Sequence, residues 1–184
     1  MKSMVVYESM YGNSHVVADR IAIGLRVFGE VSVVPVCDAT ADSLAGVDLV
    51  VVGGPTHVHG MSSERSRRAA VETATKPGSV LRLDAGAHGA GLREWLDSLD
   101  DGNQRAAAAF DTRSGGPVLL TGKASKAIAR RLERRNFRVV DKPTSFIVQR
   151  DNTLAEGAEI AARLWGESIG RTVSIGMSLT QPSK

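Results

Sequence analysis

The sequence is poor in the features that mark secreted and membrane proteins. Its one cysteine, Cys37, excludes an intramolecular disulfide, which favours a reducing, cytoplasmic environment. No apolar run approaches the ~18–20 residues that a membrane-spanning helix needs. Residues 1–7 also lack the apolar region and the small-residue cleavage site of a signal peptide. We therefore expect a cytoplasmic protein that has no membrane partner.

Aromatic residues and potential metal ligands are also scarce. Aromatic residues make up 4% of the chain, so any surface for stacking flat ligands is small. His57 and His59 are closely spaced, but His15 and His88 lie in other segments, so we expect no metal site. The remaining composition, 42% hydrophobic and 23% charged over 184 residues, is ordinary for one globular domain.

Positive charge is concentrated in one segment. The formal net charge is +3, but residues 123–138 alone carry seven basic residues against one acid, Glu133. The basic residues are Lys123, Lys126, Arg130, Arg131, Arg134, Arg135 and Arg138. At helical spacing they form a basic face that suits an anionic partner, either an acidic protein or a nucleic acid. Without interleaved aromatics or a DNA-binding motif, nucleic acid is disfavoured, and a solvated helix face is the simpler alternative.

Strand and helix patterns alternate along the chain. Short β-branched runs predict strands, and apolar residues at helical spacing predict helices. We predict strands at 4–7, 31–36, 47–52, 106–110 and either 137–140 or 145–148, with helices near 14–28, 62–71, 92–99, 123–135 and 154–165. Strands separated by helices indicate right-handed crossovers. The expected fold is therefore α/β, a doubly wound five-stranded parallel sheet in three α/β/α layers.

We expect one domain over residues 1–170 and a C-terminal tail over residues 171–184, where the pattern fades. Residues 76–89 are rich in glycine and small residues and predict a loop. In doubly wound sheets, ligands bind beyond the carboxyl ends of the strands, near the switch in strand order. The loops that follow Tyr7, Val52 and Phe110 are therefore the candidate binding loops.

The first of these loops joins a buried strand directly to a helix N-terminus. Its candidate ligand-binding residues are Ser9, Met10, Tyr11, Gly12, Asn13 and Ser14. Hydroxyl groups and exposed amides donate hydrogen bonds, and the helix dipole favours an anion, so the loop suits a phosphate monoester. It lacks the lysine of a nucleoside triphosphate loop and the glycine pattern of a dinucleotide site. A serine-capped turn is the simpler alternative.

Residues 5–14, together with Ala18 and Ile21, resemble the FMN-phosphate signature of the flavodoxin family. Ser14 stands where that family prefers threonine, which keeps the hydroxyl. The resemblance covers roughly residues 2–169, is weakest over 62–90, and shows no large insertion in the fifth strand. It implies a flavodoxin-like fold of the short-chain type, with FMN as the cofactor.

The resemblance also assigns roles to the other two loops. In this family, the loop after the third strand covers one face of the flavin ring; here it offers Pro55, Thr56, His57, Val58, His59 and Gly60. The usual aromatic cover is missing, and His57, His59 and Met61 are the candidates for its place. The loop after the fourth strand contacts the flavin edge, which makes Asp111, Thr112 and Arg113 candidates. Polar loop residues and a solvated arginine are the alternatives.

The resemblance implies an FMN-binding protein of cytoplasmic electron transfer that has a redox partner protein. An alternative is an FMN-dependent NAD(P)H:quinone reductase of the same fold, in which residues 62–90 would form the wall of the space for the second substrate. Electron-carrying flavodoxins are typically acidic, whereas this chain is basic, so we expect an acidic partner. Cations at His57, His59 and Arg113 would ease flavin reduction, more so below pH ~6.5, where histidine protonates.

Overall fold

The computed structural model describes residues 1–57, 60–117 and 121–180. Its strands are β1 (Lys2–Tyr7), β2 (Glu30–Pro35), β3 (Leu49–His57), β4 (Gly60–Met61), β5 (Ala106–Ser114), β6 (Arg138–Val139) and β7 (Thr144–Val148). Its α-helices are α1 (Asn13–Leu25), α2 (Glu64–Thr75), α3 (Leu92–Ser98), α5 (Ala124–Arg134) and α6 (Ala158–Thr180). Two 3-10 turns, η1 (Arg26–Phe28) and η2 (Asp42–Leu44), follow α1 and precede β3.

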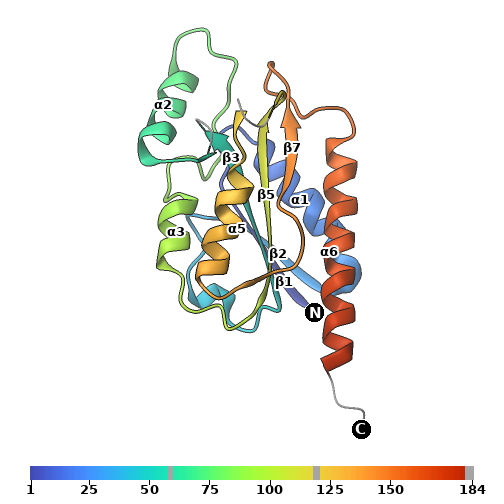
Figure 1. Cartoon of the computed structure of the whole chain (residues 1–184). Coiled ribbons are helices and arrows are strands. Elements are labelled where there is room, and N and C mark those ends of the chain that lie inside the picture. The colour runs from blue at the N-terminus through green and yellow to red at the C-terminus, as the bar shows by residue number, and fades with distance from the viewer. Residues whose placement is uncertain (58–59, 118–120, 181–184) are drawn as a thin grey trace.

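The strands form one parallel sheet in the order β2-β1-β3-β5-β6, with β7 also paired to β5 (Figure 1). The order reverses at β1, which lies between β2 and β3. The short β4 pairs antiparallel with the end of β3 and closes a hairpin. The expected doubly wound parallel sheet is confirmed, and its switch point lies at the carboxyl ends of β1 and β3.

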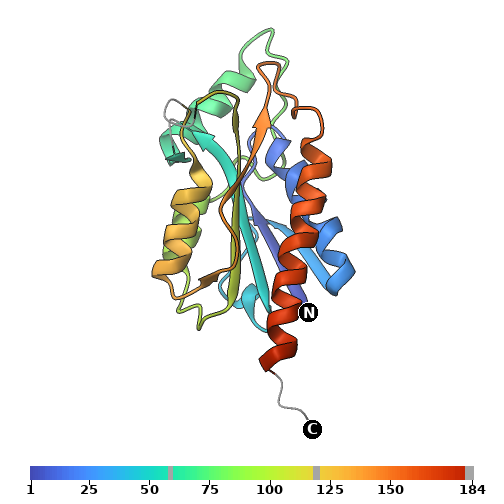
Figure 2. The ribbon, with the colours of Figure 1, turned by 45° about the vertical axis from the view of Figure 1, so that its right-hand side comes forward.

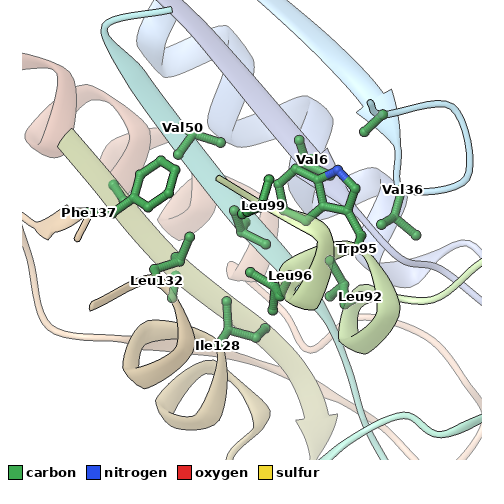
Figure 3. Packing of buried hydrophobic residues seen from close by; sticks show 14 of the residues in the cluster. Val6, Val36, Val50, Leu92, Trp95, Leu96, Leu99, Ile128, Leu132 and Phe137 are labelled. Atoms are coloured by element: carbon green, nitrogen blue, oxygen red, sulfur yellow. The ribbon is translucent and has the colours of Figure 1, made fainter. Parts of the chain in front are cut away.

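Helices cover both faces of the sheet (Figure 2). Alternation along β1 sends Val5 toward the layer of α1 and α6, and Val6 toward the layer of α3 and α5. Both valines are fully buried. Figure 3 shows side chains of α3 and α5 packed against Val6 and Val50 of the sheet. These two apolar layers account for the continuous apolar runs of the central strands.

The helices α1 and α6 pack with their backbones in contact. A Cβ atom added to Gly24 of α1 would lie 2.1 Å from the carbonyl oxygen of Arg163, and one added to Gly166 of α6 would lie 2.3 Å from that of Ile21. No side chain fits at either position. The two glycines therefore fix the distance between these helices.

The fifth strand position is shared by both segments that the sequence offers for it. β6 pairs with Ala106 and Ala107 near the start of β5, and β7 pairs with the segment from Phe110 onward. Residues 140–143 separate the two strands and end in Pro143, which has no N–H to donate to a neighbouring strand. The single strand expected at this position is therefore two short ones.

The C-terminal helix corrects a second expectation. α6 continues beyond Arg171 to Thr180, so the prediction of a C-terminal tail is wrong for residues 171–180. Residues 181–184 lie outside the described residues. Ile169 and Val173 are 1% and 3% exposed. Their contacts with the α1 layer hold a segment whose local pattern is weak.

The segment after β4 follows the prediction more closely. Ser63 caps α2, because its Oγ accepts from the Ser66 amide at 3.2 Å while the Ser66 Oγ accepts from the Ser63 amide at 2.8 Å. The helix runs to Thr75, four residues beyond the predicted end, and residues 76–91 hold no helix or strand. None of the helices in the described part of the chain is both long enough and apolar enough to span a membrane.

Candidate functional site

The loop after β1 forms an open cradle at the N-terminus of α1. Gly12 adopts a left-handed conformation, with φ of 91°, and its amide donates to the Ser9 Oγ at 3.1 Å. A Cβ atom added to Gly12 would meet nothing within 4 Å. The first amides of α1 have no acceptor within the helix, and Gly12 has no side chain to cap them. These donors therefore face open space, where an anion gains from the helix dipole.

Hydrogen bonds tie this cradle to loops far away in the sequence. The Ser14 Oγ lies 2.7 Å from the Thr112 Oγ1, and both residues are buried. The Asn13 amide group donates to the carbonyl oxygen and to the Oδ1 of Asn152, both at 3.0 Å. The loop after β1, the end of β5 and the turn after β7 therefore hold one another in position. The loop predicted from residue 111 begins only after Ser114, because residues 111–114 continue β5 and pair with β7.

Together with the end of β3, these loops enclose a pocket at the carboxyl edge of the sheet. It is lined by Ser9, Met10, Tyr11, Asn13, Ser14, Pro55, Thr56, His57, Thr112, Arg113, Ser114, Val148 and Asn152. None of these described lining residues carries a carboxylate, and Arg113 is the only one with a permanent positive charge. The pocket therefore offers hydroxyls, amides and one guanidinium, a donor set that suits an anionic or carbonyl-rich ligand.

Arg113, near the end of β5, is held in place by residues that follow it in the chain. Its Nη1 donates to the Ser114 and Gly116 carbonyls at 3.2 and 3.1 Å, and to the Thr121 Oγ1 at 2.7 Å. Its Nε is buried and has no partner among the described residues. A buried donor without a partner is costly, so this Nε is available to a ligand oxygen or nitrogen.

His57 is a neutral imidazole at neutral pH. Burial lowers the pKa of its ring below the ordinary 6.5; the negative charge of Glu8 opposes this effect and the positive charge of Arg67 adds to it. The expectation that His57 protonates just below pH 6.5 is therefore wrong, because burial moves its protonation to lower pH. Arg113 remains as the described cation of the pocket.

Tyr11 and His57 also form one wall of a second hollow. The Tyr11 hydroxyl donates to the Ala70 carbonyl at 2.8 Å and so ties the first loop to α2. The rest of its lining comes from Ser63, which caps α2, and from Arg65, Ser66, Ala69, Ala70 and Thr73 of α2. The small side chains of α2 leave this hollow open beside the pocket.

Ten of the predicted residues line the pocket, and the others have different positions. Gly12 shapes the cradle, and Gly60 pairs with His57 in the hairpin. Asp111 turns inward: it is fully buried, and its Oδ2 accepts from the Ser125 amide at 2.7 Å. It is therefore not a lining residue, because it caps the start of α5. Val58 and His59 lie outside the described residues.

Met61 and Cys37 also have structural positions. Met61 is 4% exposed and packs in the core beside α3 and α5, so the expectation that it covers a ring is wrong. Cys37 is half-buried, and burial raises the pKa of its thiol, which keeps it protonated and unreactive.

Three lining residues were not predicted: Ser114, Val148 and Asn152. Val148 ends β7, and Asn152 follows it in a turn with φ of 64°. The rule that ligands bind at the carboxyl ends of strands applies equally to this last strand. The turn-forming run Asp151-Asn152 after it was the available signal.

These residues fit FMN. The cradle has room for one phosphate where a side chain at Gly12 would project, and it holds hydroxyls and amides in place of lysine. The unpartnered Arg113 Nε adds a donor within the same pocket. Among the described residues, no group of three or more histidine, cysteine or acidic side chains is placed to hold a metal ion.

Comparison with known proteins identifies the same fold. The flavodoxin family model matches residues 5–160. Flavodoxin 1 from Bacillus cereus is 21% identical, with 93% of this chain and 98% of that chain covered and a TM-score of 0.63. A flavodoxin from the domain Archaea is 19% identical, with 94% and 99% covered and a TM-score of 0.62.

A larger protein contains a similar unit. The flavodiiron protein from Giardia intestinalis is 20% identical, with a TM-score of 0.62. The match covers 98% of this chain but 38% of that chain. Comparison with curated proteins finds no match.

Proposed function

The chain belongs to the flavodoxin family, whose cofactor is FMN, and we propose that it carries electrons between protein partners in the cytoplasm. Bound FMN supplies the redox chemistry, and the protein supplies binding, orientation and electrostatics. The observation that carries the proposal is the cradle of Gly12 and the first amides of α1, which is joined to the end of β5 through Ser14 and Thr112.

In this proposal, each part of the pocket has one task. The first amides of α1 and the Ser9 and Ser14 hydroxyls hold the phosphate. The Arg113 guanidinium donates to the flavin from the end of β5, and its own bonds to the Ser114 and Gly116 carbonyls fix its direction. Tyr11 and neutral His57 flank the ligand on the side of α2.

The test is a matched pair of glycine variants. Gly12→Val fills the phosphate space with a branched side chain, so FMN binding should be lost. Gly46→Val is the control, because Gly46 also has a positive φ, 68°, and nothing within 4 Å of an added Cβ, yet it lies far in the sequence from the loop that begins α1 and outside the residues that line the pocket. Flavin fluorescence titration with FMN, FAD and riboflavin measures affinity. Normal FMN binding by Gly12→Val, or a preference for FAD, would overturn the assignment.

Part of the predicted basic face is engaged within the protein. Arg131 forms an ion pair with Asp97, Arg135 donates to the Asp97 carbonyl, and Lys123 donates to the Pro143 carbonyl. These three residues are therefore anchored to the protein rather than fully available to a partner.

The remaining exposed cations of α5 are Lys126, Arg130 and Arg134, which we call the basic ladder. Steps of four residues place them on one helix face over ~12 Å. The helix starts beside the pocket, because the Ala124 amide donates to the Thr56 Oγ1 at 3.0 Å. An acidic redox protein docked on the basic ladder would thus lie close to the flavin, which supports the proposal of an acidic partner.

The double variant Arg130→Glu/Arg134→Glu tests this docking, with Arg26→Glu, exposed at the end of α1, as the control. We expect slower electron transfer to an acidic iron–sulfur protein in the double variant, and faster transfer to a basic cytochrome. Salt should erase both effects as the screening length falls from ~10 Å at 0.1 M to ~3 Å at 1 M. FMN affinity should not change. Equal rates in all variants would mean that the basic ladder is a solvated surface that docks no redox partner.

The cytoplasmic assignment is supported by the single, half-buried Cys37. Fractionation of the source cells with an antibody against the protein tests it directly. Recovery in a membrane or extracellular fraction would overturn it.

A second candidate function, an FMN-dependent NAD(P)H:quinone reductase, is favoured by the hollow along α2. This hollow shares Tyr11 and His57 with the pocket, so a flat substrate placed in it would lie next to the cofactor site. Anaerobic addition of NADH or NADPH should then bleach the flavin absorbance, and a soluble benzoquinone should restore it. Ala69→Trp, which fills the hollow, should abolish turnover and leave FMN affinity intact. If neither nucleotide bleaches the flavin, the reductase function is ruled out and the carrier function remains.

A further inference from the structure

The helix α6 has one apolar face that is covered, and on its outer side it carries further large apolar residues that are exposed. Ala162, Ile169 and Val173 are buried against the rest of the protein. On the opposite side, four large apolar side chains face solvent: Ile160 (63% exposed), Leu164 (51%), Ile175 (56%) and Leu179 (81%). At about 100° per residue, these four fall within one side of the helix, opposite the buried positions. We call them the outer apolar stripe.

Such a stripe is unusual on a monomer. A surface helix normally has a polar outer face, and a helix that is apolar on both sides is covered on both sides. Half of the eight large hydrophobic residues that are exposed in the described part of the chain belong to this stripe. α6 lies at the edge of the molecule, and its lower part extends past the sheet (Figures 1 and 2). Nothing in the described fold covers the outer apolar stripe.

The order of residues along the stripe identifies the partner. Ile160 and Leu179 lie equally far from a point between Ile169 and Gly170, and so do Leu164 and Ile175. If a second α6 is laid antiparallel across that point, Ile160 meets Leu179 and Leu164 meets Ile175 of the other copy. One patch thus matches itself over ~28 Å, as an interface with two-fold symmetry requires.

Two charges near the centre of the stripe are arranged almost symmetrically about the same point, since Glu167 and Arg171 lie equally far from Ile169. Glu167 and Arg171 lie on this side of α6 and form an exposed ion pair at 3.0 Å within one helix. In the antiparallel arrangement, Glu167 of one copy approaches Arg171 of the other, twice per dimer. A parallel arrangement would instead bring like charges together. The charges therefore favour an antiparallel self-contact over a parallel one.

We propose that the chain forms an antiparallel homodimer through the outer apolar stripe of α6. The two flavin pockets would remain open, because the pockets lie at the carboxyl edge of the sheet and the stripe lies on the outer side of α6. The basic ladder on α5 belongs to the opposite layer and stays free for a redox partner.

Sedimentation of the full, FMN-loaded chain from ~1 µM to ~1 mM tests the dimer. We expect a species of twice the 19.5 kDa chain mass. Leu164→Arg should shift the dissociation constant by at least tenfold toward monomer. Val80→Arg, at a valine that is 88% exposed on a loop, is the control and should not shift it. A monomer throughout the range, or a dimer that Leu164→Arg leaves unchanged, would overturn the proposal.

A charge swap tests the antiparallel order. Glu167→Arg alone and Arg171→Glu alone should each be monomeric, since each places like charges opposite one another. An equimolar mixture of the two variants should form a heterodimer, because every pair is then attractive. Circular dichroism and FMN titration verify that both variants are folded. Folded variants that fail to associate in the mixture would refute the antiparallel contact.

Discussion

His57 shows how much a single residue depends on its surroundings. Its ring lines the pocket, and burial holds its pKa below 6.5, so the folded protein resists its protonation. The unfolded chain, in which the ring is solvated, binds that proton more readily. The unfolded state therefore carries more protons at mildly acidic pH, and the free energy of unfolding rises with pH.

We predict that His57→Asn flattens this dependence. Wild-type protein should lose stability as the pH falls from about 7 to about 5, through the ordinary histidine pKa, and the variant should lose less. Urea unfolding of wild type and His57→Asn across this range measures the two slopes. Identical slopes in wild type and His57→Asn would show that its burial has no energetic consequence.

Asn152 anchors the site from the far end of the chain. It accepts two hydrogen bonds from Asn13 and occupies a left-handed conformation. Asn152→Gly keeps that conformation and removes the side-chain acceptor, so Asn13 at the start of α1 should lose part of its support. A hydrogen bond of about 0.5–1.4 kcal/mol corresponds to a two- to tenfold loss of FMN affinity.

Fluorescence titration of Asn152→Gly measures that loss. Asn103→Gly is the matched control, because Asn103 is also left-handed, with φ of 47°, but lies outside the pocket. If both variants bind FMN like wild type, Asn152 has only a turn-forming role.

At the scale of whole elements, the contact of α1 with α6 is decided by glycine. A helical glycine is normally about 1 kcal/mol less favourable than alanine, so replacing it usually stabilises a helix. At Gly24 and Gly166 the opposite holds, because an added methyl group would overlap the backbone of the facing helix. The preference of each helix alone is overruled by the packing between them.

We predict that Gly24→Ala and Gly166→Ala each destabilise the fold by about 1–3 kcal/mol, the usual cost of overpacking. For a domain of this size, the melting temperature should fall by roughly 2–4 °C per kcal/mol. Gly176→Ala, also within α6 but with nothing within 4 Å of an added Cβ, should be neutral or slightly stabilising. Calorimetry compares the three, and equal melting temperatures would contradict the close packing.

At the scale of the whole molecule, the pocket joins segments that are far apart in the sequence, such as those that contain Asn13 and Asn152. A ligand that bridges these loops binds only the folded chain, so it raises stability by mass action. FMN at 100 times its dissociation constant should add about 2.7 kcal/mol, or roughly 5–11 °C in melting temperature.

Riboflavin, which lacks the phosphate, should add less at the same concentration, and FMN should add nothing to Gly12→Val. Thermal melts monitored by circular dichroism, with each ligand titrated, give the comparison. A riboflavin effect equal to that of FMN would mean that the cradle does not hold the phosphate.

The sequence by itself determined the features that are local in the chain. Apolar periodicity is a property of neighbouring residues, so it identified the alternating strands and helices and therefore the parallel sheet. The composition of residues 9–14 likewise predicts a phosphate loop, because its hydroxyls, its glycine and the helix start are neighbours in the chain. Ser63 as the cap of α2 was predictable for the same reason, since its partner Ser66 is three residues away.

Only the tertiary structure decided the features that depend on distant partners. The composition of the strand ends does not reveal that Asp111 of β5 turns inward to cap α5, or that burial lowers the pKa of His57 of β3. The helical extent of residues 171–180 depends on contacts of Ile169 and Val173 with the α1 layer, because the local pattern there is weak. Burial and long-range hydrogen bonds set these outcomes, and neither is encoded in the spacing of neighbouring residues.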